Sequence, residues 1–175
     1  MTNLPYHREN LAAAIQQRAR QELETAGADQ ISLRQLARFL AVTPAAIYRH
    51  FPDKASLLAT LRAEILDEVG AALRAGVLDS PDATTMLQRL ITNLLTYQQE
   101  HPRAVAFVLT ASWPLPQSLK TVLTLWGAQA QVTVVSDQVT AVWTFLLGVL
   151  CQPPATYPGE WVQQQVTQLL RPRPS

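Results

Sequence analysis

The side chains with the clearest chemical potential lie in one short stretch, from Thr43 to Lys54. Tyr48 and His50 stand two residues apart, and Lys54 follows them closely. A phenol hydroxyl, an imidazole N–H and an ammonium group are hydrogen-bond donors suited to phosphate oxygens. The residues from Thr43 to Ala46 are small, so a helix beginning there has a slim end that fits the major groove of DNA, about 12 Å wide. The stretch predicts contact with duplex DNA.

Two short helices joined by a tight turn must position these side chains. Ser32 can cap the first helix, which carries apolar residues on one face. Thr43 followed by Pro44 is a strong start signal for the second, and Pro52 ends it just after Phe51, which we assign to the core. Two helices with a short turn between them form a helix-turn-helix, whose second helix can enter the major groove.

Arg34 lies in the first turn of the first of these helices, where it can reach the groove and bind guanine through two hydrogen bonds. Taken alone, Tyr48 is also compatible with a buried core position, but its register with His50 and Lys54 favours DNA. The predicted DNA-binding residues are Arg34, Thr43, Pro44, Ala45, Ala46, Tyr48, Arg49, His50 and Lys54.

One uninterrupted pattern runs through this region: Gly27, Ser32, Leu36-Ala37, Val42-Thr43, Ile47-Tyr48, His50-Phe51, Lys54 and Leu57-Leu58. It resembles the N-terminal signature of the TetR family of transcriptional regulators. The resemblance implies that the residues at Arg34 and Thr43 to Ala46 face bases, and that those at Tyr48, His50 and Lys54 touch phosphates. One position departs from the family: the turn residue that is usually glycine is Ala41. If its φ is positive, alanine costs roughly 1 kcal/mol there.

The rest of the chain also has helical periodicity, and we expect an all-α protein of about nine helices. Residues 1–52 are predicted to form the DNA-binding domain, and residues 53–175 a helical regulatory and dimerisation domain. Asp53 can cap a long fourth helix, and a sixth helix is expected from Pro102 to near Trp113-Pro114. Asp137 can cap an eighth helix, and a last helix is expected over about residues 160–171.

The last two helices are the predicted dimer interface. Their broad apolar faces would form a four-helix contact with a second copy. A two-fold dimer presents two reading helices about one DNA turn apart, so it prefers a palindromic site. The predicted interface residues are Val139, Val142, Trp143, Leu146, Leu150, Val162, Val166 and Leu169.

A small-molecule effector is expected in an apolar cavity among the fifth to eighth helices. Its candidate contacts are Met86, Phe107, Trp113 and Trp126, and the few charges between Gln88 and Val135 favour a neutral or hydrophobic ligand. Such a ligand would release a repressor from its operator by preferring a conformation that does not fit DNA. The rival hypotheses are a helical module that binds a partner protein instead of a small molecule, and a ligand-binding enzyme on the same fold.

Composition argues against other classes. The net charge is only +1, so total charge does not indicate a nucleic-acid partner. The three histidines, at 7, 50 and 101, lack the spacing of metal ligands, and no glycine-rich phosphate loop is present. We therefore expect no enzyme activity, metal or cofactor. A single cysteine, no apolar leader and no run long enough to cross a bilayer predict a cytoplasmic protein.

Overall fold

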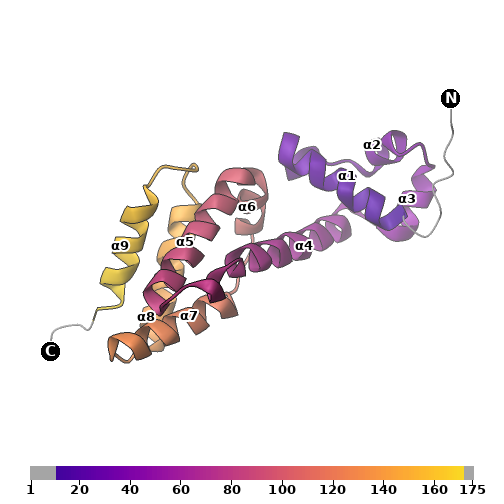
Figure 1. Ribbon diagram of the computed structural model, residues 1–175. Helices are drawn as coiled ribbons and strands as arrows, with labels where there is room; N and C mark the ends of the chain where they lie inside the picture. Colours follow the sequence, from indigo (N-terminus) through magenta and orange to yellow (C-terminus); the bar gives the residue numbers. More distant parts are fainter. Residues whose placement is uncertain (1–10, 172–175) are drawn as a thin grey trace. The chain divides into compact units, whose positions relative to one another are not determined.

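The computed structural model describes residues 11–171, and within that range the regular structure is helical, without strands (Figure 1). The all-α prediction and the expected number of helices are therefore confirmed. The α-helices are α1 (Leu11–Ala26), α2 (Leu33–Phe39), α3 (Pro44–His50), α4 (Lys54–Arg74), α5 (Ala83–Glu100), α6 (Pro102–Leu109), α7 (Gln117–Ala130), α8 (Ser136–Leu150) and α9 (Gly159–Leu169). Two short 3-10 segments, η2 (Ala28–Gln30) and η3 (Val77–Asp79), precede α2 and α5.

The chain divides into two compact units inside α4, between Ile65 and Leu66. The domain boundary predicted from the sequence lies earlier, between residues 52 and 53, ahead of this helix. The first half of α4 belongs to the N-terminal unit, and it buries Leu57 and Leu61 completely. Because these two leucines are buried, the first half of α4 belongs with the N-terminal helices, and the two units separate within α4 and not at its start.

The N-terminal unit is held together by apolar faces of its helices. Ile15 and Leu23 of α1, Leu36 of α2 and Ile47 of α3 are fully buried, and the core position of Phe51 is confirmed. Helix α3 starts where the sequence indicates, because the Thr43 hydroxyl accepts a hydrogen bond from the backbone N–H of Ala46 at 3.3 Å. These local signals and the shared core fix α3 in place.

The caps of the neighbouring helices agree only in part with the sequence. The carboxylate of Asp53 accepts from the backbone N–H of Ser56 at 2.7 Å, as expected for a residue that caps α4. Ser32 occupies the N-cap position of α2, but its side chain makes no capping hydrogen bond. The start of α2 therefore depends on packing of Leu33 and Leu36 in the core.

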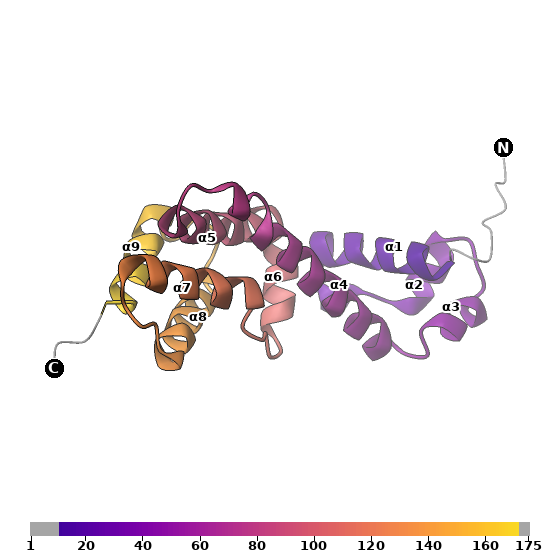
Figure 2. The same cartoon turned by 60° about the horizontal axis from the view of Figure 1, so that its bottom comes forward.

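The C-terminal unit is organised around α5. This helix packs against α6, α7 and α9, while α8 packs against α6 and α9 (Figures 1 and 2). Leu90, Ile91 and Leu94 of α5 are almost completely buried, as are Leu119 of α7 and Leu146 of α8. An α5 enclosed in this way contributes its apolar stripe to one core shared by all the later helices.

Two predicted boundaries are wrong. Helix α6 ends at Leu109 instead of near Trp113. The backbone N–H of Thr110 bonds three residues back, to the Phe107 carbonyl at 3.3 Å, and the i→i−4 pattern stops there. Trp113 nevertheless packs in the core, where Trp143 Nε1 donates to its carbonyl oxygen at 3.2 Å.

The second correction concerns the start of α8. This helix begins at Ser136, so Asp137 lies in its first turn and is not the cap. Val135 is the N-cap residue of α8, and its backbone N–H donates a hydrogen bond to the amide oxygen of Gln138 at 3.1 Å.

The turn between α2 and α3 carries backbone strain. Ala41 has a φ of 54°, in the left-handed region where a non-glycine residue costs roughly 1–2 kcal/mol. We expect Ala41→Gly to stabilise the protein by about 1 kcal/mol after the added flexibility of the unfolded chain is counted, which raises the melting temperature by about 2–4 °C. The matched control is Ala59→Gly, at an exposed site inside α4, which should cost about 1 kcal/mol. A lower melting temperature for Ala41→Gly would contradict this account.

Two helical glycines differ sharply in the space around them. A Cβ at Gly127 of α7 would lie 2.7 Å from Val134 Cγ2 and 2.8 Å from the Val132 carbonyl oxygen, whereas at Gly148 of α8 it would meet nothing within 4 Å. We expect Gly127→Ala to destabilise the fold by about 1–3 kcal/mol, and Gly148→Ala, whose Cβ meets no atom of the same chain, to cost markedly less. Denaturant titration of both variants measures the difference, and equal midpoints would refute it.

Candidate nucleic-acid interface

Helix α3 has one buried and one exposed face. Ile47 is fully buried and Ala46 is 8% exposed, so both face the core of the N-terminal unit. Ala45, Tyr48 and Arg49 are exposed, and Tyr48 retains 41% of its accessible surface. With 3.6 residues per turn, these three positions share the outward side of the helix. The exposed face therefore presents one small residue, one phenol and one guanidinium.

Two predicted DNA-binding residues have other structural tasks. The side chain of Ala46 points into the core, so the prediction that it faces DNA bases is corrected. The exposed Thr43 is also the cap of α3, because its hydroxyl accepts from the Ala46 N–H. Pro44 and His50 are exposed, as expected of residues that contact a partner.

The outer side of α2 adds a feature that the sequence analysis missed. Arg34 is exposed as predicted, and Arg38, one turn later on the same helix, is exposed as well. From Gln30 to Pro52 the chain has three arginines and no acidic residue. This local excess is hidden in a net charge of +1 for the whole chain, and it makes the surface of α2 and α3 favourable for phosphate.

Phe39 is the second residue that the sequence analysis missed. It is 61% exposed at the end of α2, and the guanidinium carbon of Arg18 lies 3.6 Å from the centre of its ring. Arg18 also pairs with Glu22 of its own helix, with 3.4 Å between Nε and the carboxylate. The helical pattern could have indicated this exposure, because Phe39 falls outside the apolar stripe of α2.

Lys54 is half-buried and makes a specific internal contact. Its ammonium group donates to the carbonyl oxygen of Asp29 at 2.8 Å, which joins the beginning of α4 to η2. An ammonium group has three donors, so this bond leaves capacity for a phosphate. Lys54 therefore stabilises the N-terminal unit in addition to supplying positive charge.

The predicted dimer residues mostly lie inside the chain's own core. Val142, Trp143, Leu146, Leu150, Val162 and Val166 are all buried by other parts of the same chain, so they are not a surface for a second copy. Leu169 is 37% exposed and Val139 is half-buried.

Two aromatic side chains of the C-terminal unit are exposed near α8 and α9. Trp161 stacks on Tyr157, with 4.7 Å between the ring centres. The ring centre of Phe145 in α8 lies 6.0 Å from that of Trp161. Trp161 and Tyr157 keep 37% and 38% of their surface exposed. This aromatic cluster, Phe145, Tyr157 and Trp161, joins α8, α9 and the loop between them, and two of its three rings are exposed.

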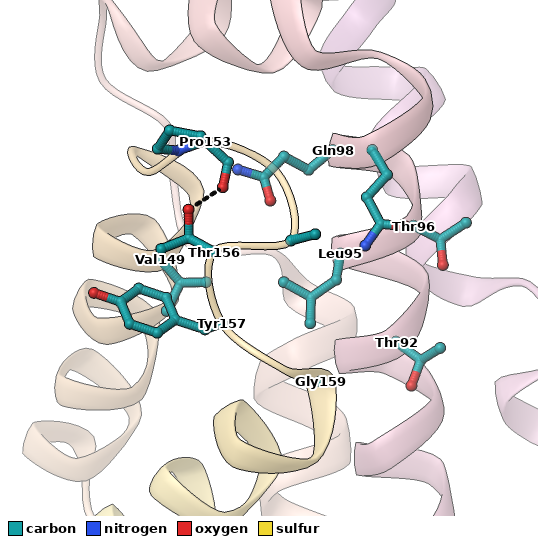
Figure 3. Close-up of a pocket in the computed structure, with 11 residues that line it drawn as sticks. Thr92, Leu95, Thr96, Gln98, Val149, Pro153, Thr156, Tyr157 and Gly159 are labelled. Atoms are coloured by element: carbon teal, nitrogen blue, oxygen red, sulfur yellow. Dashed lines mark hydrogen bonds between the residues drawn. The ribbon is translucent and has the colours of Figure 1, made fainter.

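The four predicted ligand contacts do not line the cavity shown in Figure 3. Phe107 and Trp113 are each 8% exposed and pack in the core, while Met86 and Trp126 are half-buried. The cavity instead lies between α5 and the loop that joins α8 to α9, and its volume is about 130 Å³.

Residues 11–171 show neither a metal-binding cluster nor a membrane-spanning helix. Across residues 11–171, no three His, Cys, Asp or Glu side chains are grouped in a way that could hold a metal ion. In the same part of the chain, no helix has both the length and the apolar character needed to span a bilayer.

Comparison with known proteins points to one family. Residues 15–61 match the family model described as "Bacterial regulatory proteins, tetR family", which covers most of α1 and extends into α4. The nucleoid occlusion factor SlmA of Shewanella frigidimarina (strain NCIMB 400) is 33% identical over 82 residues, which are 47% of this chain and 42% of that protein. The match therefore spans less than half the length of this relative.

Solved structures share the whole fold. A protein of unknown function from Rhodococcus sp. RHA1 has a TM-score of 0.73 at 23% identity, covering 96% of this chain and 97% of the other. A regulatory protein of the tetR family from Rhodococcus RHA1 has a TM-score of 0.64 at 20% identity, covering 91% and 94%. At these identities the similarity concerns the fold.

Proposed function

We propose that this chain, whose residues 15–61 match the tetR family of bacterial regulatory proteins, represses transcription as a homodimer on a palindromic operator until a small neutral ligand releases it. The observation that carries this proposal is the acid-free face of α2 and α3. It combines Arg34, Arg38 and Arg49 with the exposed phenol of Tyr48.

The proposed division of labour on DNA follows from side-chain chemistry. Ala45 and Pro44 keep the end of α3 slim enough for the major groove, and Arg34 or Arg49 can bind guanine with two hydrogen bonds. Tyr48, His50 and Lys54 donate to phosphates on either side. Phosphate contacts hold the protein in register and make binding depend on salt, while base contacts select the sequence.

We place the dimer contact on the exposed side of α8 and α9. Ala141, Thr144 and Gly148 lie exposed along α8, so a second helix can approach closely there. The aromatic cluster lies beside them and supplies apolar area that a partner copy would cover. Two copies would then form a four-helix contact and present two α3 helices to successive turns of DNA.

Ligand release is a two-state proposal. A ligand that binds better to the conformation that does not fit DNA lowers operator affinity by the ratio of its two affinities, typically ~1–3 kcal/mol of coupling. Helix α4 runs unbroken from one compact unit into the other, so it is the covalent connection through which such a shift would act.

A second candidate replaces the small molecule with a partner protein. The similarity to SlmA favours it, because that relative is named a nucleoid occlusion factor and not a regulator of transcription. Both candidates require DNA binding, and they differ in what the C-terminal unit recognises.

DNA binding is tested by footprinting and fluorescence anisotropy on the DNA upstream of the protein's own gene. We expect a protected palindrome and an affinity that falls steeply with salt. Tyr48→Phe should weaken binding to all sequences alike, and Arg34→Ala should also reduce discrimination between bases by about 1–3 kcal/mol. Arg74→Ala, which removes an exposed arginine at the end of α4, is the control and should bind normally. Unaltered affinity in Tyr48→Phe and Arg34→Ala would refute the assigned interface.

The dimer contact is tested by sedimentation velocity. Gly148→Arg and Trp161→Glu introduce bulk or charge on the exposed side of α8 and α9, and we expect both to give folded monomers. Leu125→Glu, which changes an exposed leucine of α7, is the control and should remain dimeric. Dimers of unchanged mass in both test variants would place the contact elsewhere.

A further inference from the structure

The cavity of Figure 3 is built from two segments that are distant in sequence. Leu95, Thr96 and Gln98 of α5 form one wall, and the loop of residues 152–158 forms the other. Val149, near the end of α8, belongs to the lining as well. The volume of about 130 Å³ is close to that of a cavity known to accept benzene, about 150 Å³, and well below the roughly 300–1,000 Å³ of pockets for drug-sized ligands. The space admits a molecule with a single six-membered ring.

Gln98 determines the polarity of this cavity. The residue is 4% exposed, and its amide nitrogen donates to the Leu150 carbonyl at 2.9 Å and to the Gln152 carbonyl at 3.0 Å. Both amide hydrogens are thus in use, so the side chain can only accept a further hydrogen bond. Figure 3 shows its amide oxygen pointing into the space between α5 and the loop. A ligand that donates a hydrogen bond fits this position.

The remaining lining is uncharged and combines threonine hydroxyls with apolar surface that suits the ring of a neutral ligand. Leu95 and Val149 are buried apolar side chains, and Tyr157 adds an aromatic ring. None of the residues that line this cavity carries a formal charge. An ionised ligand would lose its hydration there without gaining a charged partner, which is costly.

The loop has its shape before any ligand arrives. Ala155 has a φ of 62°, in the left-handed region that is unfavourable for alanine. The Thr156 hydroxyl donates to the Pro153 carbonyl at 2.6 Å, and prolines at 153, 154 and 158 restrict the backbone further. Strained residues of this kind persist where the surroundings determine the conformation, and they are frequent at ligand clamps. A preformed wall lowers the entropy lost when a ligand binds.

We propose that this cavity is a binding site for a small neutral molecule with one six-membered ring and one hydroxyl group, which donates its hydrogen bond to the amide oxygen of Gln98. The ligand would lie between α5 and the loop that connects α8 with α9. Its binding does not depend on the proposed function, but an effect on operator affinity rests on it.

The test uses phenol as the probe and the ¹⁵N-labelled full chain in NMR titrations. We expect phenol to shift the backbone amide signals of Ala155, Thr156 and Tyr157 and the side-chain amide of Gln98, with saturation. Anisole has the same ring but no donor, and it should bind at least 10-fold more weakly. Benzoate, which is charged, should not bind. Failure of phenol to cause saturable shifts in the folded wild-type chain would overturn the proposal, as would equal binding of anisole.

Variants locate the site. Val149→Phe fills the apolar part of the cavity, and Thr96→Trp covers it from an exposed position that tolerates a large side chain. We expect both to lose the saturable phenol shifts. Val139→Phe makes a similar change on the same helix outside the lining, and it should bind phenol like the wild type. Retained phenol binding in folded Thr96→Trp would overturn the assignment even if Val149→Phe did not fold.

Separate readouts keep the two proposals distinct. Operator binding is measured without phenol, and phenol binding is measured without DNA. Saturable phenol shifts in a protein that does not bind DNA would leave the site in place and refute the proposed function. Operator binding by a protein that shows no phenol shifts would refute the phenol site and leave the proposed function in place. If both hold, adding phenol to the operator complex tests whether the site controls release.

Discussion

The burial of one face of α3 is the constraint on which the candidate interface depends. Ile47 is fully buried and Ala46 nearly so, and burial of an isoleucine stabilises a fold by roughly 1.5–3 kcal/mol. A helix of this pitch that hides both positions must turn Ala45, Tyr48 and Arg49 outward. The cap at Thr43 prevents the helix from starting elsewhere, so the exposed face cannot rotate without loss of the core. The exposed face of the candidate interface is thus a consequence of the packing beneath it.

In the C-terminal unit, packing within the chain likewise determines which face of α8 is exposed. The apolar face of α8 is covered by α6 and α9 of the same chain, and the proposed dimer contact uses its exposed side. That side has small residues such as Gly148 next to the aromatic cluster. Gln98 of α5 meanwhile donates to the carbonyl of Leu150, which fixes the end of α8 and the start of the loop. The core, the proposed dimer contact and the cavity therefore all involve α8.

The sequence predicted helix ends well where a capping side chain bonds to backbone groups a few residues away. The cap at Thr43 and the cap at Asp53 act within a few residues, and the structure has both of them. The predictions failed where a distant residue decides. The sixth helix was predicted to reach Trp113-Pro114, but Trp113 is buried in a loop through its contact with Trp143. Periodicity cannot distinguish these two ways of burying a tryptophan.

The sequence by itself determined the all-helical class, the helix-turn-helix and most of the exposed donors on α2 and α3. These follow from spacing, caps and turn residues, which act over short distances along the chain. Only the tertiary structure decided that Ala46 faces inward, that Lys54 is bonded to Asp29, and that the apolar face of α8 is internal. An apolar stripe in the sequence shows that one face of a helix will be buried, but it does not show which element covers that face. Whether the same chain or a second copy covers it depends on how all the helices pack.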